Sequence, residues 1–371
     1  MFKETERIDS LQFVRTIAFL GVYLYHAVKT FPGQGRLYEF FSNSPGPWGV
    51  SVFFTLSGFL MTYSYWNRGP DSSLKGSVLF SLKKIRKLYP LHLVMLFLGT
   101  VYWLLRGQNP FILLKRLAIA VPLVQTWFPE GYRAINSVAW YFSVCLFLYF
   151  CFPSLLSLIK KKIGIGLSLV GLIAIFLFRL WIGSFVFQYL DIDIKWATYY
   201  HPVFRLGDFV IGGFLASIYI GRKENDSKHY SKSVYSLLEF LAIVLNIAAC
   251  ILFVKLPDNA AWFKFTSLFV LSSVIIVYFF SLNAGIMSDL LTNRVTFWFA
   301  RISPYAFLIH RLVIYYFYSF SRYVSHDRQI NWIIVVTVPF LITVLVVYLY
   351  LFLAGIVKRY FGNFEIVKTP E

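Results

Sequence analysis

The stretch QFVRTIAFLGVYLYHAV, residues 12–28, decides the fold class, because it is long, apolar and nearly free of charge. A helix needs about 20 mostly apolar residues to cross a bilayer. Nine further segments share this character: approximately 48–66, 88–105, 138–158, 165–188, 203–220, 235–256, 263–283, 298–319 and 331–354. Their apolar runs are continuous, whereas the strands of a membrane barrel alternate. The sequence therefore predicts an all-α, polytopic membrane protein with about ten transmembrane helices.

The composition agrees with this interpretation. Of the 371 residues, 58% are hydrophobic and 14% are charged, whereas a soluble domain has about 25% charged residues. No repeat, low-complexity tract or soluble segment interrupts the pattern, so we expect a single transmembrane domain over 1–371. An eleventh apolar stretch, 111–127, carries Lys115, Arg116 and Pro122. It is expected to be interfacial or re-entrant rather than spanning.

The positions of the charges predict the orientation. The formal net charge is +18, with 35 Lys and Arg against 17 Asp and Glu. Nineteen of the basic residues fall on the same side as the N-terminus, eleven on the other side and five inside the predicted spans. The clusters at 81–87 and 160–162 contribute most to this imbalance. Because basic loops stay in the cytoplasm, both termini are predicted to be cytoplasmic, and no nucleic-acid partner is needed to explain the charge.

Several kinds of site have no signature in this sequence. Cys145, Cys151 and Cys250 lie inside apolar runs without metal-ligand spacing, so neither a disulfide framework nor a metal site is expected. The nucleotide-binding, metalloprotease and hydrolase motifs are also absent from the sequence. Carboxylates within the spans are few, and Asp208 is the clearest, which disfavours a proton-coupled transporter.

The first predicted helix carries the sharpest candidate for chemistry, Arg15 and His26. Eleven residues of helix bring the two side chains to nearly the same direction, about 16 Å apart along the axis. A histidine there could take a proton from a substrate hydroxyl, and an arginine could pair with phosphate or hold a carbonyl. The alternative is a buried histidine that is bonded to a neighbouring helix.

Other segments offer candidate supporting groups. The small residues of 49–61, Ser57 among them, let helices approach closely. Lys83, Lys84, Arg86 and Lys87 precede a helix that begins at Tyr89, where they could hold lipid headgroups or a soluble polyphosphate such as a nucleotide. His201, Arg205 and Asp208 are spaced to share one helix face, with Arg205 and Asp208 as a structural pair. His310 is predicted to lie in the middle of a helix, one to two turns after Ser303 and Tyr305.

Six segments together resemble one known family. They are LQFVRTIAFLGVYLYH at 11–26, GVSVFFTLSGFLM at 49–61, KKIRKLYPLHL at 83–93, WYFSVCLFLYFCFP at 140–153, FRLGDFVIGG at 204–213 and ISPYAFLIH at 302–310. In this order they are similar to the acyltransferase-three family of bacterial integral membrane O-acyltransferases. The first matches its R-x10-H helix, and the fourth its W-x-L-S-x-E motif through Trp140 and Ser143.

The resemblance implies transfer of an acyl group, usually acetyl and sometimes succinyl, from cytoplasmic acyl-CoA to a hydroxyl of a cell-envelope or exported glycan. Lipopolysaccharide and exopolysaccharide are typical acceptors. It implies that His26 is the general base or a transient acyl carrier, that Arg15 orients the donor, and that the basic segment with Tyr89 binds CoA. Acyl-CoA is then a co-substrate, no cofactor is permanently bound, and the protein resides in the bacterial cytoplasmic (inner) membrane.

The sequence departs from the family at one position and leaves one alternative open. Cys145 stands where the family often has a glutamate, so the role of that glutamate is either vacant here or filled by another residue. The chain resembles the standalone form without a fused SGNH domain, which would act on its acceptor directly or through a separate extracytoplasmic partner. The alternative function is a transporter or flippase for a polysaccharide or lipid-linked glycan, with His26 and the buried arginines lining a polar path.

Overall fold

The computed structural model describes residues 6–131, 135–160, 165–224, 230–325 and 331–361. Most of these residues are in helices, and none of them is in a strand. The helices are α1 (Ser10–Thr30), α2 (Arg36–Asn43), α3 (Pro45–Ser64), α4 (Leu74–Ile85), α5 (Tyr89–Leu105), α6 (Pro110–Ala120), η1 (Gln125–Trp127), η3 (Ser137–Ala139), α7 (Trp140–Lys160), α8 (Ile165–Tyr189), η4 (Trp196–Tyr200), α9 (Pro202–Glu224), α10 (Lys232–Lys255), η5 (Asp258–Ala260), α11 (Ala261–Thr266), α12 (Leu268–Ser281), α13 (Ile286–Leu291), α14 (Arg294–Ser325) and α15 (Trp332–Phe361).

The prediction of an all-α polytopic membrane protein is confirmed. All ten predicted spans are helical, and 263–283 covers the successive helices α11 and α12. Seven helical segments of the described chain are long and apolar enough to cross a membrane, or eight if α4 and α5, which meet at 61°, form one bent span. Helix α6 has eleven residues, about 16 Å, which is too short to span and agrees with the expectation for 111–127. The number of crossings and the side of each terminus stay predictions.

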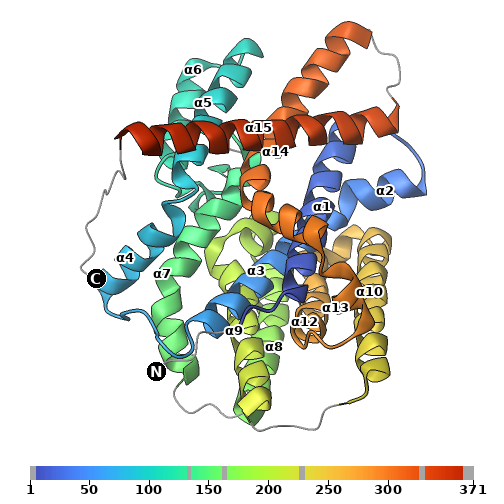
Figure 1. Cartoon of the computed structure of the whole chain (residues 1–371). Coiled ribbons are helices and arrows are strands. Elements are labelled where there is room, and N and C mark those ends of the chain that lie inside the picture. Colours follow the sequence, from blue (N-terminus) through green and yellow to red (C-terminus); the bar gives the residue numbers. More distant parts are fainter. Residues whose placement is uncertain (1–5, 132–134, 161–164, 225–229, 326–330, 362–371) are drawn as a thin grey trace.

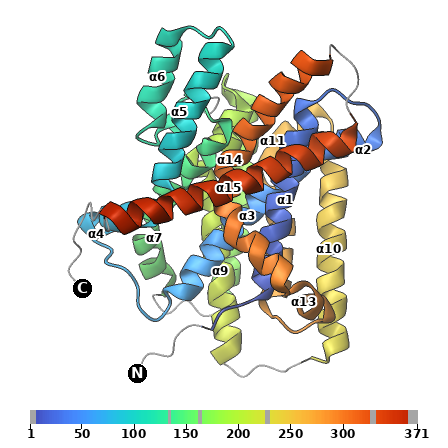
Figure 2. The same cartoon turned by 45° about the horizontal axis from the view of Figure 1, so that its top comes forward.

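Helices α1 and α3 form the centre of the molecule, and α7, α8, α9, α10 and α14 stand around them (Figure 1). Helix α15 crosses the outside of the bundle at a steep angle to α10 (Figures 1 and 2). It is joined to α1 by a hydrogen bond from the Tyr23 hydroxyl to the carbonyl of Val336, at 2.6 Å. Figure 2 also shows α5 and α6 side by side at the end of the bundle where α1 finishes.

Two glycines of α3 allow close contacts with the neighbouring helices α9 and α1. A Cβ on Gly58 would lie 1.9 Å from the carbonyl oxygen of Phe209 in α9, and a Cβ on Gly49 would lie 2.4 Å from that of Ala18 in α1. Both distances are far inside van der Waals contact, so only glycine fits at either place. This confirms that the small residues of 49–61 serve helix packing.

The bundle is apolar on its outside and partly polar within, the arrangement that lipid favours. Helix α10 exposes apolar side chains such as Phe240 and Leu245. Its inner face carries Glu239 and Asn246, which are buried. Asn246 Oδ1 accepts a 2.7 Å hydrogen bond from the Trp48 indole of α3, and Glu239 accepts from the backbone N–H of Gly285.

The two ends of the bundle differ in the chemistry that they display. At one end Glu6, which precedes α1, contacts Tyr63 near the end of α3 and Lys223 near the end of α9. At the other end α1 finishes just after His26, near η3, η4 and the loops around them. We refer to these as the Glu6 end and the His26 end.

Candidate active site

His26 lies in the last two turns of α1 and lines a cavity of about 530 Å³ at the His26 end. The walls come from α1, the start of α3, the ends of α5 and α6, the start of α7, the π-helix η4 and α14. Seven elements from separate parts of the sequence thus enclose the cavity that His26 lines. A concave site built this way is where a ligand is best surrounded.

Helix α14 places two further groups beside His26. The rings of His26 and His310 lie 5.3 Å apart at 43°. His310 is fully buried, and its Nδ1–H donates to the carbonyl of Ala306 at 3.1 Å, so in this tautomer the lone pair is on Nε2. Nε2 has no hydrogen-bond partner among the described residues.

Arg311, the next residue of α14, fastens the end of α1. Its Nη1 donates to the hydroxyl of Thr30 at 2.8 Å and to the carbonyl of His26 at 3.3 Å. The guanidinium also lies 4.1 Å above the ring of Tyr315. These contacts fix the position of His26 relative to α14. His310, a predicted supporting residue, thus lies directly beside His26.

Aromatic side chains form much of the cavity wall. The ring of Tyr25 lies 4.9 Å from that of His26. Across the cavity, Trp140 packs edge-to-face with Tyr200 at 4.8 Å and against Tyr199 at 5.2 Å. Trp140, predicted as a supporting residue, therefore lies in the same cavity as His26.

Arg15 faces a different pocket. It lines a space of about 620 Å³ near the Glu6 end together with Arg7, Asp9, Gln12, Phe297, Ala300 and Arg301. The two predicted catalytic residues are thus on one helix but open toward opposite ends of the bundle, as their separation of about 16 Å along the axis requires.

A ladder of α7 side chains lies between these two levels. Tyr141, Cys145 and Tyr149 are four residues apart and share one face of α7. The Cys145 thiol is a side-chain hydrogen-bond partner of both tyrosines, and Tyr141 is one of Ser57 in α3. Arg15 interacts electrostatically with both tyrosines. The position of the family glutamate is therefore flanked by phenol hydroxyls, which the sequence analysis did not single out although their spacing was visible.

The predicted donor-binding residues do not converge on either pocket. Lys83 and Arg86 are exposed, and the Lys84 ammonium lies 4.7 Å over the ring of Tyr65. Lys87 lies 5.5 Å over Tyr305, one helical turn from the Arg301 that lines the Arg15 pocket. Among the predicted donor residues, Lys87 is therefore the one whose described contact lies near the Arg15 pocket.

Tyr89 and two of the three predicted serines, Ser143 and Ser303, make hydrogen bonds that serve packing. The Tyr89 hydroxyl donates to the carbonyl of Val121, which ties α5 to the end of α6. Ser143 Oγ donates to the carbonyl of Leu123 at 2.6 Å, and Ser303 Oγ donates within α14 to Ala300. None of the three lines the His26 cavity or the Arg15 pocket.

The predicted pair of Arg205 and Asp208 is present and has a third member. Arg205 Nη1 lies 2.5 Å and Arg179 Nη2 lies 2.8 Å from the carboxylate of Asp208, and all three side chains are at most 3% exposed. Arg205 Nε also donates to the carbonyl of Tyr199 in the cavity wall. His201 does not join them, which corrects the predicted spacing: α9 begins at Pro202, and His201 packs beside Trp127 and Trp196.

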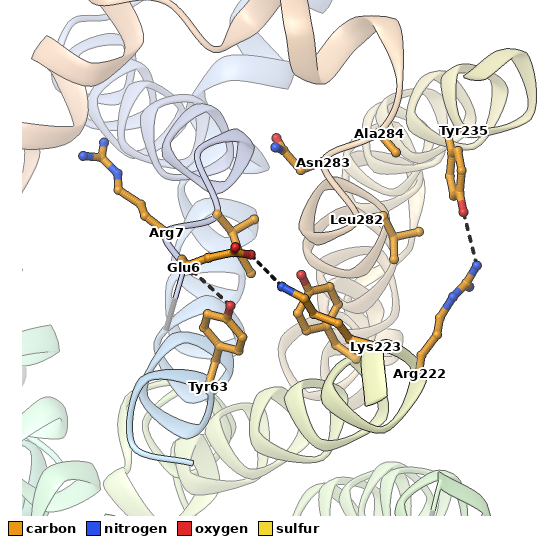
Figure 3. Close-up of a pocket in the computed structure, with 11 residues that line it drawn as sticks. Glu6, Arg7, Tyr63, Arg222, Lys223, Tyr235, Leu282, Asn283 and Ala284 are labelled. Atoms are coloured by element: carbon orange, nitrogen blue, oxygen red, sulfur yellow. Dashed lines mark hydrogen bonds and ion pairs between the residues drawn. The ribbon is translucent and has the colours of Figure 1, made fainter. Parts of the chain in front are cut away.

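A second pocket at the Glu6 end, of about 480 Å³, is a weaker candidate (Figure 3). Lys223 reaches Glu6 at 2.7 Å, and Arg222 points to the hydroxyl of Tyr235 at 3.4 Å. Arg7 points away from these groups and pairs with Asp9. The cations there already have protein partners, and no histidine or cysteine is among the described lining residues.

Comparison with known proteins identifies the family. Residues 8–352 match the sequence family described as "Acyltransferase domain". The chain belongs to this acyltransferase family. It is 25% identical over 298 residues to a Staphylococcus aureus (strain COL) protein with the name "Putative O-acetyltransferase", covering 74% of this chain and 46% of that protein. It is 30% identical over 173 residues to "Acyltransferase MdmB" of Streptomyces mycarofaciens, covering 42% of this chain and 41% of that protein.

This chain spans about half the length of the curated relatives that it matches. No solved structure matches it. The expected resemblance to the acyltransferase-three family is confirmed, and the chain is a multi-pass membrane member of it. The matched region contains all the described lining residues of the His26 cavity and those of the Arg15 pocket except Arg7.

Proposed function

We propose that the protein is an O-acyltransferase of the bacterial inner membrane that moves an acetyl group from acetyl-CoA to a hydroxyl of a cell-envelope or exported glycan. The observation that carries this proposal is the position of His26, which lines a ligand-sized cavity and lies against the imidazole of His310. Family membership supports acyl transfer, and the names of the relatives support acetyl as the group.

In the proposed reaction, His26 takes the proton of the acceptor hydroxyl as its oxygen attacks the thioester carbonyl. The C–S bond breaks, the sulfur leaves with the proton as CoA–SH, and an ester forms. If His26 instead carries the acyl group, a C–N bond to the imidazole forms as the C–S bond breaks, and the sulfur leaves with the imidazole proton as CoA–SH. The acceptor oxygen then forms the ester as the C–N bond breaks, and its proton returns to the imidazole. In both versions the imidazole must stay fixed, and its contacts with α14 serve that purpose.

The donor is proposed to enter at the Glu6 end, which is taken as cytoplasmic. Three arginines, Arg7, Arg15 and Arg301, outnumber Asp9 in the lining of the pocket there, and this net positive charge suits the phosphates of CoA. Lys87 lies over Tyr305, one helical turn from Arg301. The acyl arm would then extend along α1 and the Tyr141–Cys145–Tyr149 face of α7 toward His26. Of the predicted donor residues, this arrangement keeps Lys87 and leaves Lys83, Lys84, Arg86 and Tyr89 in supporting or packing roles.

The test replaces His26 with alanine and follows transfer of radiolabelled acetyl from acetyl-CoA to glycan in membranes. We expect the labelled product to fall by a factor of about 100 or more, because proton transfer by a positioned group contributes about 10²–10⁴. The matched control is His201→Ala, since His201 does not line the cavity.

Wild-type labelling by a correctly inserted His26→Ala protein would contradict the proposal. Label that never reaches glycan, in a protein that nevertheless moves glycan across the membrane, would favour the transporter alternative. The buried arginines and the polar cavity are what make that alternative worth testing.

A further inference from the structure

The His26 cavity has an unusual charge balance. Lys29, Arg116, Lys195 and Arg311 all line it, and no carboxylate is among its described lining residues. The cations come from four separate segments, α1, α6, the residue before η4, and α14. Like charges that are gathered in a concave wall repel one another and focus a positive potential on the space between them.

Three of these cations, Lys29, Arg116 and Arg311, make no ion pair with a carboxylate among the residues that the structure describes. Lys29 donates to the hydroxyl of Tyr25 at 3.0 Å, and Arg311 donates to Thr30 and to the carbonyl of His26. Arg116 makes no ion pair with any residue that the structure describes.

The buried arginines elsewhere are treated differently. Arg179 and Arg205 lie within 2.8 Å of the carboxylate of Asp208, so this fold supplies a counter-charge where an arginine has only a structural role. Arg311 makes no ion pair with any carboxylate that the structure describes, and its Nε is a buried atom without a hydrogen-bond partner among the same residues. The contrast indicates that the anion for the His26 cavity comes with the ligand.

We infer that the acceptor is an anionic glycan, which carries a carboxylate or phosphate on or next to the sugar that is acylated. This inference rests on the proposed function and names its substrate class. The anion lies against Lys29, Arg116 and Arg311, while a sugar face lies on the aromatic wall of Trp140 and Tyr200. His26 is thereby aimed at a neutral hydroxyl beside the anchored charge.

The first experiment measures binding to the His26→Ala protein in nanodiscs of zwitterionic lipid, so that no turnover is needed. The probes are trimeric oligogalacturonate and its methyl ester, which has the same backbone without the charges. Oligo(glycerol phosphate) serves as the phosphate probe. We expect the acid form, the phosphate probe or both to bind at least tenfold more tightly than the methyl ester. The preference should weaken with salt.

The double variant Lys29→Gln, Arg116→Gln should reduce that preference to about twofold or less. Lys223→Gln at the Glu6 end is the matched control and should keep it. Binding of the methyl ester equal to that of both charged probes, or no binding of either charged probe, would overturn the inference. So would displacement of the bound anionic probe by anionic lipid in the nanodisc, because the cations would then serve the membrane surface.

The second experiment isolates the product that native membranes label from radioactive acetyl-CoA and applies it to an anion exchanger at neutral pH. Labelled glycan that is retained after removal of lipid supports the inference, and labelled glycan that flows through overturns it. If no glycan is labelled, the proposed function fails. The binding preference then decides the charge inference by itself.

Discussion

Asp208 is a fully buried carboxylate that holds two buried guanidinium groups, those of Arg179 and Arg205. Removal of one partner from a buried ionic network leaves charges that neither water nor protein compensates. We expect Asp208→Asn to lower the free energy of unfolding by about 3–5 kcal/mol, measured from denaturation midpoints in detergent micelles.

The matched control for that variant is Glu6→Gln. It also breaks a carboxylate–cation pair, but the side chains of Glu6 and Lys223 are 81% and 55% exposed. An exposed pair contributes at most about 1 kcal/mol, so the control should shift stability little. Equal effects of the two variants would show that burial does not set the strength of the Asp208 network.

Sequence reasoning at this scale found the local pairs and missed the distant ones. Arg205 and Asp208 are three residues apart in a helix, so their contact follows from helix geometry. Arg179 reaches the same carboxylate from another helix, and no spacing rule predicts that. The predicted spacing is wrong for His201, because its backbone is extended and separates η4 from α9.

Helix α3 depends on glycine where it meets α9. Because a Cβ at Gly58 would lie 1.9 Å from the carbonyl of Phe209, we expect Gly58→Ala to separate the helices and destabilise the protein by at least about 1–3 kcal/mol. Thermal unfolding in micelles measures this. Gly355→Ala in α15 is the control, since nothing lies within 4 Å of a Cβ there.

The control should be neutral or slightly stabilising, because alanine favours a helix over glycine by about 1 kcal/mol. A loss of stability as large as that of Gly58→Ala would instead point to a general effect of glycine replacement in this membrane protein. Tolerance of Gly58→Ala would mean that α3 and α9 approach less closely than described.

At the scale of elements, hydropathy predicted where the helices are, and small residues predicted which face of α3 packs closely. Hydropathy could not predict which helices cross one another. The contact between His26 and His310 joins α1 to α14 across 284 positions of sequence, and it depends on that crossing. The basic segment shows the opposite case. Its residues are adjacent in sequence, but they lie at the bend between α4 and α5, and the side chains of Lys84 and Lys87 lie over different rings.

For the whole molecule, the central feature is that helix α1 carries one candidate functional residue near each of its two ends. Arg15 opens to a basic pocket near the Glu6 end, and His26 opens to an aromatic, cationic cavity at the other end. The charge count of the loops predicts that the Glu6 end is cytoplasmic. The donor and the acceptor are therefore expected to reach the protein from opposite faces of the membrane.

Sealed vesicles of the two orientations test this expectation most directly. Radiolabelled acetyl-CoA, which does not cross a bilayer, is added outside inverted and right-side-out vesicles from the same cells, and labelled glycan is counted. The account predicts labelling in inverted vesicles, where the Glu6 end faces the added acetyl-CoA, and at least tenfold less in right-side-out vesicles until detergent opens them. Equal labelling in both intact preparations, or labelling of right-side-out vesicles alone, would contradict it.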